Sequence, residues 1–379
     1  MKVFVQTRSC STGSGQEPAK TLFLLLSLML VAEVHAQDFT YTNINGTITI
    51  TGYRGSGGAV TIPSALNGLP VTSIGEGAFY GVRTINSVTI PNSVTGVGDQ
   101  ALLGCESLTN ISLGSSVTNL GNNVFDGCVS LTNILVATLN PAYESADGVL
   151  FDKNEHMLFA YPPGKAGSYA IPTGVTNVGP YAFSSCTSLT NLTLPASMTR
   201  IGPDAFASFM GLSHIGIPDG VGTIGTNAFS GCFLLASAAL GKGVTNIEDY
   251  AFGECTNLRA MYFRGNAPGI ANDAFFGAYF TAYYLPGTTG WGTTFGGLPA
   301  VLWNPHVPTG DVSFGVLQNG FGFNIAGTPD VPLVVEACTN LGTQSWVALQ
   351  NCTLTNGSIH FNDPHWTNFP GRFYRIRSP

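Results

Sequence analysis

Short apolar stretches recur along most of the chain at a fixed interval, and each contains one central bulky apolar residue, usually the phenylalanine of an Ala–Phe pair. We call this residue the plug. The eight plugs are Phe79, Leu102, Phe125, Phe183, Phe206, Phe229, Phe252 and Phe275. They are 23 residues apart, except for one step of 58, and an aliphatic residue five positions earlier keeps the same interval. Such regularity predicts a solenoid of stacked coils.

A second apolar pattern follows the plug, as in Leu189-Thr-Asn-Leu192-Thr-Leu194. Its alternation buries one face of a short strand. The I-G pair before the plug predicts another short extended segment, and the Ala–Phe pair is expected to begin a tight helical turn. Because one coil cannot bury its own apolar face, coils must stack. The sequence therefore predicts a β-rich leucine-rich repeat solenoid of 23-residue coils, with short strands and tight helical turns, over residues 71–304.

Other segments depart from the repeat. Residues 37–70 alternate like antiparallel strands with glycine-rich turns and predict an N-terminal β cap. An insertion at about 140–170 has two apolar stretches around a polar turn at Asp152–His156, which predicts a hairpin. An aromatic, glycine-rich stretch at about 281–304 is expected to cap the last coil. Residues 309–379 contain period-2 stretches and predict a small all-β, sandwich-like C-terminal domain.

Charge and the N-terminus narrow the class of protein. Only 9% of residues are charged, the net charge is −7 and no basic run is present, so nucleic acid is not expected as a partner. An apolar run at Leu22–Val31 lies between basic residues and a small-x-small pattern, which predicts a secretory signal peptide over residues 1–36. A buried N-terminal helix is the alternative. No later stretch approaches about 20 apolar residues, so we expect no transmembrane segment after signal removal.

The complete coil, I-G-x-x-A-F-x-x-C-x-x-L-x-x-L-x-L-P-x-x-V-T, resembles the BspA-like leucine-rich repeats of bacterial secreted and surface proteins over roughly residues 60–300. The resemblance implies an extracellular solenoid, and this family is associated with adhesion and with binding host or matrix proteins. It brings no catalytic residue with it. Residues 309–379 resemble a C-terminal module that recurs in bacterial secreted proteins, and the sequence assigns no role to it.

Five coils carry a cysteine three residues after the plug. These are Cys105, Cys128, Cys186, Cys232 and Cys255. The other three coils carry Val82, Phe209 and Ala278 there, so we interpret the cysteines as structural core thiols. Disulfides between neighbouring coils are the alternative, since stacked positions are close. Cys338 and Cys352 lie on candidate neighbouring strands of an exported domain, so a disulfide is expected between them.

Metal-ligating residue types cluster twice, at Asp152, Glu155 and His156 and at His360, Asp363 and His365. A plain turn explains the first cluster, and a strand with its turn explains the second, so neither a metal nor a cofactor is predicted. The sequence also contains no recognisable nucleophile–base set or paired carboxylates, so we do not expect an enzyme.

The exposed positions of the repeat strands are the candidate binding surface, because solenoids bind on such extended faces. These positions are small, polar and almost uncharged, with aromatic residues near the C-terminal end. The candidates are Asn110, Ser112, Asn191, Thr193, His214 and Tyr262. Such a face suits a polysaccharide or a neutral protein surface. The sequence thus predicts a secreted or extracellular, non-enzymatic binding or adhesion protein. A structural or self-associating cell-surface component without a discrete ligand is the alternative.

Overall fold

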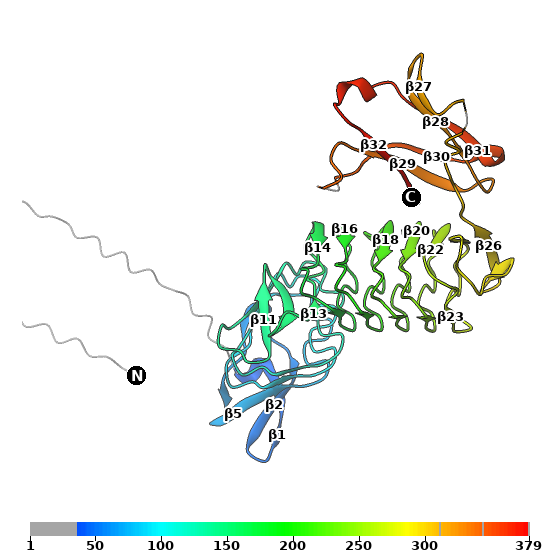
Figure 1. Ribbon diagram of the computed structural model, residues 1–379. Helices are drawn as coiled ribbons and strands as arrows, with labels where there is room; N and C mark the ends of the chain where they lie inside the picture. The colour runs from blue at the N-terminus through cyan, green and yellow to red at the C-terminus, as the bar shows by residue number, and fades with distance from the viewer. Residues whose placement is uncertain (1–35, 311, 343–344, 378–379) are drawn as a thin grey trace, which may run out of the picture. The chain divides into compact units, whose positions relative to one another are not determined.

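The computed structural model describes residues 36–310, 312–342 and 345–377 (Figure 1). The predicted signal peptide lies outside these residues, apart from its last position. Within the described ranges, no helix has the length and apolar character needed to cross a membrane.

From residue 58 to residue 302 the chain winds into stacked coils, which we call the repeat region. Each coil contributes one strand to a long-strand row and one, usually of two residues, to a short-strand row. The long-strand row contains β3 (Gly58–Thr61), β6 (Ile85–Thr89), β8 (Asn110–Leu113), β10 (Asn133–Val136), β14 (Gly167–Ala170), β16 (Leu189–Thr193), β18 (His214–Ile217), β20 (Ser237–Leu240), β22 (Ala260–Phe263), β24 (Thr281–Tyr284) and β26 (Leu298–Leu302). Successive strands lie side by side, as β14 to β22 show in Figure 1.

The short-strand row runs along another side of the same coils. It contains β5 (Leu69–Ile74), β7 (Gly96–Val97), β9 (Asn119–Leu120), β13 (Met157–Ala160), β15 (Asn177–Val178), β17 (Arg200–Ile201), β19 (Thr223–Ile224), β21 (Asn246–Ile247) and β23 (Gly269–Ile270). Most neighbours in both rows pair in parallel one repeat apart, as His214 does with Ser237 and Ile201 with Ile224. The pairing is interrupted between β10 and β14, between β16 and β18, and between β9 and β13. The backbone hydrogen bonds therefore run from coil to coil along the stack.

Antiparallel strands occur at both ends of the repeat region and in the insertion. At the N-terminal end, a short 3-10 helix (Ala36–Asp38) precedes β1 (Phe39–Ile44), which pairs with β2 (Thr47–Tyr53). β2 then pairs in parallel with β5, and β4 (Ala65–Leu66) pairs with β5 from the other direction. The insertion forms β11 (Tyr143–Ala146) and β12 (Val149–Asp152), and β12 pairs with β13. At the C-terminal end, β25 (Thr294–Phe295) pairs with β26.

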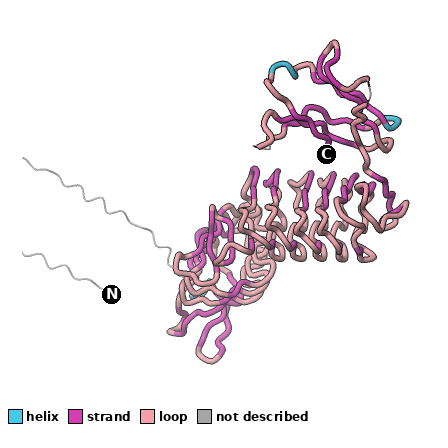
Figure 2. Tube along the Cα trace, in the orientation of Figure 1, coloured by secondary structure: helices cyan, strands magenta, loops and turns pink. Residues whose placement is uncertain are grey.

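The corner that carries the plug is a loop of hydrogen-bonded turns and not the expected helical turn (Figure 2). In most coils the residues two before and two after the plug both have positive φ, such as Gln100 (56°) and Gly104 (73°) around Leu102. Two left-handed residues within five positions interrupt the right-handed backbone that a helix needs. The 23-residue coils and short strands are confirmed, whereas the tight helical turns are wrong.

The plugs fill the centre of the coils. From Phe183 to Phe275 they form a continuous aromatic column, with successive ring centroids 4.9 to 6.1 Å apart. In the N-terminal coils Leu102 separates Phe79 from Phe125, so aliphatic packing replaces ring stacking there. Each plug is at most 8% exposed, and stacking buries what a single coil would leave in water.

Residues 303–377 form a separate six-stranded unit, which we call the C-terminal sandwich. One sheet contains β27 (Gly315–Leu317), β28 (Gly320–Ala326) and β31 (Ser358–Asp363), and the other contains β30 (Val347–Thr353), β29 (Pro332–Cys338) and β32 (Phe373–Arg377). Two short 3-10 helices, Thr355–Gly357 and Trp366–Asn368, lie in its loops. Phe323, Val335 and Phe361 belong to its own core, which confirms the predicted small all-β domain.

Candidate functional site

Alternate residues of the long-strand row project from the coils and form columns along the stack. In β18, His214 and Gly216 are exposed, while Ile215 and Ile217 are buried. Parallel pairing continues the columns onto the next strand, where the Nδ1 atom of His214 lies 2.8 Å from the hydroxyl of Ser237. The spacing of neighbouring side chains is therefore set by the strand spacing of about 4.8 Å.

The predicted binding residues do not lie on one continuous sheet. Asn110 and Ser112 lie on β8, in a four-stranded sheet that ends at β10, just before the insertion. Asn191 and Thr193 lie on β16, beyond the insertion, and His214 lies on the next strand of the row. The first two side chains are half-buried and the other three are exposed. The strand pairing of the expected face is broken at the insertion and again between β16, which pairs with β14, and β18, which pairs with β20.

Tyr262 is not an exposed residue, contrary to the sequence prediction. It is 5% exposed, and its ring stacks on that of Tyr283 at 5.3 Å between centroids. Burial, followed by the proximity of Tyr283, raises the pKa of Tyr262 well above its usual value. Strand alternation predicted an outward direction, but packing against the neighbouring aromatic residue covers the ring.

The five repeat cysteines are core residues with no solvent exposure, and all are free thiols. Four of them donate a hydrogen bond to the carbonyl of the plug in the preceding coil, as Cys232 does to Phe206 at 3.1 Å. Burial raises the pKa of the Cys232 thiol well above its usual value. A protonated, enclosed thiol is a poor nucleophile and a poor metal ligand.

Cys338 and Cys352 are also free, so the disulfide expected between them is not formed. They do lie on neighbouring strands, β29 and β30. However, Cys352 pairs with Leu333, five positions before Cys338. At about 3.4 Å per residue the two cysteines are about 17 Å apart along the strand, well beyond the roughly 7 Å that a disulfide can span between Cα atoms.

One carboxylate in each of the two metal-like clusters is engaged within the protein. The Oδ1 atom of Asp152 accepts hydrogen bonds from the backbone of His156 at 2.7 Å and of Met157 at 2.8 Å, which is a turn. Asp363 pairs with Arg372 at 2.7 Å and accepts a hydrogen bond from the Tyr374 hydroxyl at 2.8 Å. Among the described residues, no group of three ligand-type side chains is arranged to hold a metal.

The structure reveals an additional plug, Tyr161, which the sequence analysis missed. It lies at the seam, our name for the junction between the coil of Phe125 and the coil of Phe183. The Tyr161 ring stacks on Phe183 at 5.1 Å, and its backbone N–H donates to Ala182 at 2.8 Å, as plugs do in neighbouring coils. Leu158 pairs with Val178, so Leu158 to Tyr161 corresponds to Val178 to Phe183 with two residues missing.

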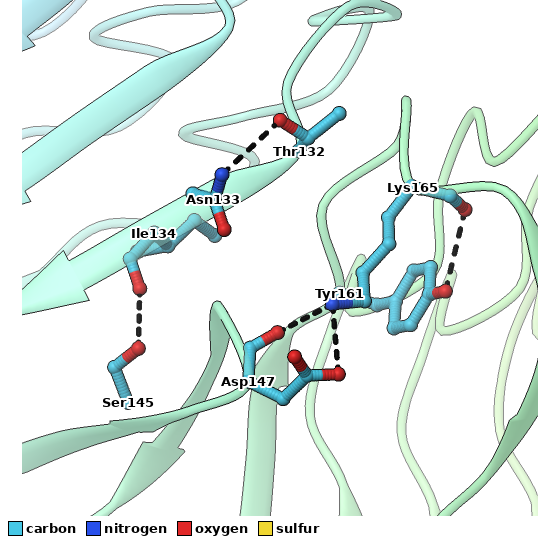
Figure 3. Close-up of polar contacts among 7 residues, drawn as sticks. All are labelled: Thr132, Asn133, Ile134, Ser145, Asp147, Tyr161 and Lys165. Carbon is cyan, nitrogen blue, oxygen red and sulfur yellow. Dashed lines mark hydrogen bonds and ion pairs between the residues drawn. The ribbon is translucent and has the colours of Figure 1, made fainter.

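Polar contacts fix the insertion to the coils beside it (Figure 3). The hydroxyl of Ser145, on β11, donates to the carbonyl of Ile134, on β10, at 2.6 Å. Farther along the insertion, the Lys165 ammonium lies 2.9 Å from the carboxylate of Asp147 (Figure 3). The Tyr161 hydroxyl donates to the carbonyl of Lys165 at 3.3 Å. The shortened coil is therefore held in a defined position, and the gap beside it has fixed walls.

That gap is a cavity of about 70 Å³, which we call the slot. Its walls include Leu120, Asn123 and Phe125 from one coil, and Pro180 and Tyr181 from the other. Leu120 is the last residue of β9, and the others lie in the turns that flank the position of the two missing residues. The slot thus arises from a local deletion in an otherwise regular stack.

Comparison with known proteins agrees with this architecture. The model of the BspA type leucine rich repeat region matches six copies, at residues 59–146 and 157–281, which is more than half of the chain. The chain belongs to the BspA type leucine-rich repeat family. The interruption of the match falls in the insertion of this BspA-type protein, between β11 and β13. No curated protein matches the sequence.

Several solved structures are similar to this BspA-type chain. A leucine rich cell surface protein from Faecalibacterium prausnitzii is 22% identical, with a TM-score of 0.41 over 65% of this chain and 93% of its own. A leucine-rich repeat protein from Eubacterium ventriosum is 21% identical, with a TM-score of 0.38 over 65% and 92%. The pneumococcal vaccine antigen PcpA is 18% identical, with a TM-score of 0.36 over 65% and 92%.

Proposed function

We propose that this chain is a non-enzymatic binding or adhesion protein that a bacterium exports to its surface or surroundings. Its partner is a protein or polysaccharide surface, which it contacts through the exposed long-strand row. This location is supported by the similarity to the leucine rich cell surface protein of Faecalibacterium prausnitzii and by the apolar segment at Leu22–Val31.

The observation that carries the proposal is the exposed, uncharged face of β16 and β18. Asn191, Thr193 and His214 are all exposed there, on strands that the repeat holds one coil apart. From β14 to β24 the outward columns contain no Asp, Glu, Lys or Arg. Such a face offers amide, hydroxyl and imidazole groups at regular spacing, which suits neutral polar partners. Asn110 and Ser112 form a second, smaller patch on β8, and the buried Tyr262 takes no part.

The test is a binding screen of the full chain against glycans, peptidoglycan and extracellular-matrix proteins. We expect Thr193→Arg, which adds bulk and charge at the centre of the face, to weaken a partner at least tenfold, or about 1.4 kcal/mol. Thr187→Arg adds the same side chain at an exposed corner position and should leave binding unchanged. Equal binding by both variants would exclude the face. Concentration-dependent assembly without any partner would favour the structural alternative.

A further inference from the structure

The slot at the seam contains backbone groups that form hydrogen bonds between coils elsewhere in the stack. In the preceding coil the N–H groups of Gln100 and Leu102 donate to carbonyls of the next coil, at 2.9 and 3.2 Å. The equivalent N–H groups of Asn123 and Phe125 have no hydrogen-bond partner in the part of the chain that the structure describes. Across the gap, the carbonyl of Pro180 accepts no hydrogen bond from those residues either. The slot therefore offers donors on one wall and an acceptor on the other.

The side chains of the slot add an apolar surface. Leu120, Leu150 and Phe159 supply this part of the lining. A backbone donor left unpaired in a buried site costs about 1–3 kcal/mol, so a ligand that satisfies the N–H groups of Asn123 and Phe125 has a favourable contribution available. The cavity has the volume of about two waters, which a single small amide group also fits.

The rim of the slot is aromatic and polar. Tyr181 is half-buried at this rim. Asn122 is exposed beside it. On the other side, Asp126 accepts hydrogen bonds from the hydroxyls of Ser184, at 2.9 Å, and Ser185, which join the two coils directly. An aromatic face next to amide groups suits a pyranose ring, whose C–H face packs on aromatic carbon and whose hydroxyls bond to amides.

We propose that the slot binds the acetamido group of an N-acetylated amino sugar. Its carbonyl oxygen accepts from the N–H groups of Asn123 and Phe125, and its N–H, which points the opposite way in a trans amide, donates to the carbonyl of Pro180 on the other wall. The methyl group lies against Leu120 and Leu150, and the sugar ring lies outside the slot against Tyr181. Charge supports a neutral group, because the Asp126 carboxylate disfavours an anion here. This site is separate from the long-strand face and does not depend on the proposed function.

The experiment uses the full chain and oligomers of N-acetylglucosamine, with saturation-transfer NMR and calorimetry as readouts. We expect the acetyl methyl protons to receive the strongest saturation, and the deacetylated glucosamine oligomer to show no binding. Asn123→Gly keeps the left-handed backbone at φ 59° but removes a side chain that lines the slot. It should weaken binding roughly three- to tenfold, because water then competes for the N–H groups of Asn123 and Phe125. Asn227→Gly is the matched control, at the same left-handed position of a regular coil, and should bind as the parent chain does.

A second variant fills the slot. Inserting Asp-Asn between Phe159 and Ala160 restores the length of a regular coil and should abolish binding, and Asn123→Gly decides the question if this variant does not fold. No binding at millimolar sugar, equal binding of the deacetylated oligomer, or binding unchanged in Asn123→Gly would each overturn the proposal. Binding of an N-acetylated amino acid amide in place of the sugar would overturn the assignment to a saccharide. Loss of binding in Thr193→Arg with retention in Asn123→Gly would place the sugar on the strand face.

Discussion

The repeat region and the C-terminal sandwich satisfy their buried polar groups in different ways. Among the described residues, the buried polar side chains of the repeat region are neutral, such as Asn140, whose amide donates to the carbonyls of Gly114 at 3.0 Å and Val117 at 2.8 Å. The sandwich places Glu336, which is 5% exposed, between Arg375 and Arg377 at 2.7 and 2.6 Å. Equivalent positions of successive coils lie next to one another, so a charge buried in every coil would lie beside a like charge and be repelled. The sandwich does not repeat, so it can place opposite charges together. The two units should therefore respond differently to substitution and to pH.

The largest effect is expected in the aromatic column. Phe229 is fully buried, and its ring lies 4.9 Å from that of Phe206 and 5.0 Å from that of Phe252. Phe229→Ala should lower the free energy of unfolding of the repeat region by about 3–5 kcal/mol, because it removes packing on two sides. Hydrogen exchange followed by mass spectrometry should show faster exchange in the repeat coils and no change in the sandwich.

The matched control is Phe233→Ala, since Phe233 follows Phe229 by four residues in the same coil and is 44% exposed. It should change stability by no more than about 0.5 kcal/mol. If Phe229→Ala accelerated exchange equally in β28 and β29, the two units would not be energetically separate, and the comparison would fail.

The next effect concerns the charged cluster of the sandwich. Glu336→Gln keeps the size of the side chain but removes the charge that two arginines contact, so we expect a loss of about 1.5–3 kcal/mol. Denaturant unfolding with exchange measured in β29 and β32 checks this value. Glu106→Gln is the control, since its ion pair with Arg83 at 2.9 Å is largely exposed and should contribute under about 1 kcal/mol. Similar losses in both variants would contradict a special role for the buried cluster.

Lowering the pH should change the stability of the two units in opposite directions, through Glu336 in the sandwich and Asp204 in the repeat region. Burial raises the pKa of Glu336, but hydrogen bonds from Arg377 and Arg375 outweigh it, and the net pKa lies below its usual value. Its stabilisation is present above the unfolded-state pKa of about 4.3 and is lost as pH falls through the lower folded-state value. The sandwich should therefore become less stable below about pH 4.

In the repeat region, burial raises the pKa of Asp204 despite hydrogen bonds from Tyr181 and Asn227. This contribution is fully present below the unfolded-state pKa of about 3.9 and is lost as pH rises through the folded-state value. Exchange measured between pH 3 and pH 6, at about one-unit steps and corrected for intrinsic rates, should show the sandwich weakening first. Glu336→Gln should flatten the response of the sandwich. Parallel weakening of both units would show that other groups dominate.

The smallest effect is expected from a single repeat thiol. Cys232→Ala removes a buried sulfur and its hydrogen bond to Phe206, and should cost about 1 kcal/mol. The parent thiol should also resist alkylation under native conditions, whereas the half-buried Cys352 should react. Mass spectrometry of the alkylated chain separates these sites. Rapid labelling of Cys232 would mean that the coils open locally.

The sequence predicted the regular part of the molecule, because each coil repeats the same pattern and burial follows from it. It missed Tyr161, because the shortened corner changes the spacing from Phe125 to 36 residues and replaces phenylalanine with tyrosine. It predicted helical corners because Gln100 and Tyr250 carry no local signal for the left-handed backbone that they adopt. The burial of Tyr262 depends on a ring in the next coil, which alternation within one strand does not report.

The Cys338–Cys352 prediction failed because the sequence did not reveal the register of the two strands. The two strands were correctly expected to be neighbours, but their register places Cys352 opposite Leu333. Register depends on the turn between the strands and on the pattern of both faces, so a shift of five residues is invisible in the spacing of the cysteines alone.

The two-residue deletion at the seam also determines how many equivalent positions the stack offers to a ligand. A perfectly periodic stack has translational symmetry, so a ligand that recognises one coil meets the same features at the next and can occupy several equivalent registers. The seam breaks that symmetry at one point, between Phe125 and Phe183. The seam is therefore a position that the regular coils do not reproduce. A ligand bound there would have one orientation and a stoichiometry of one.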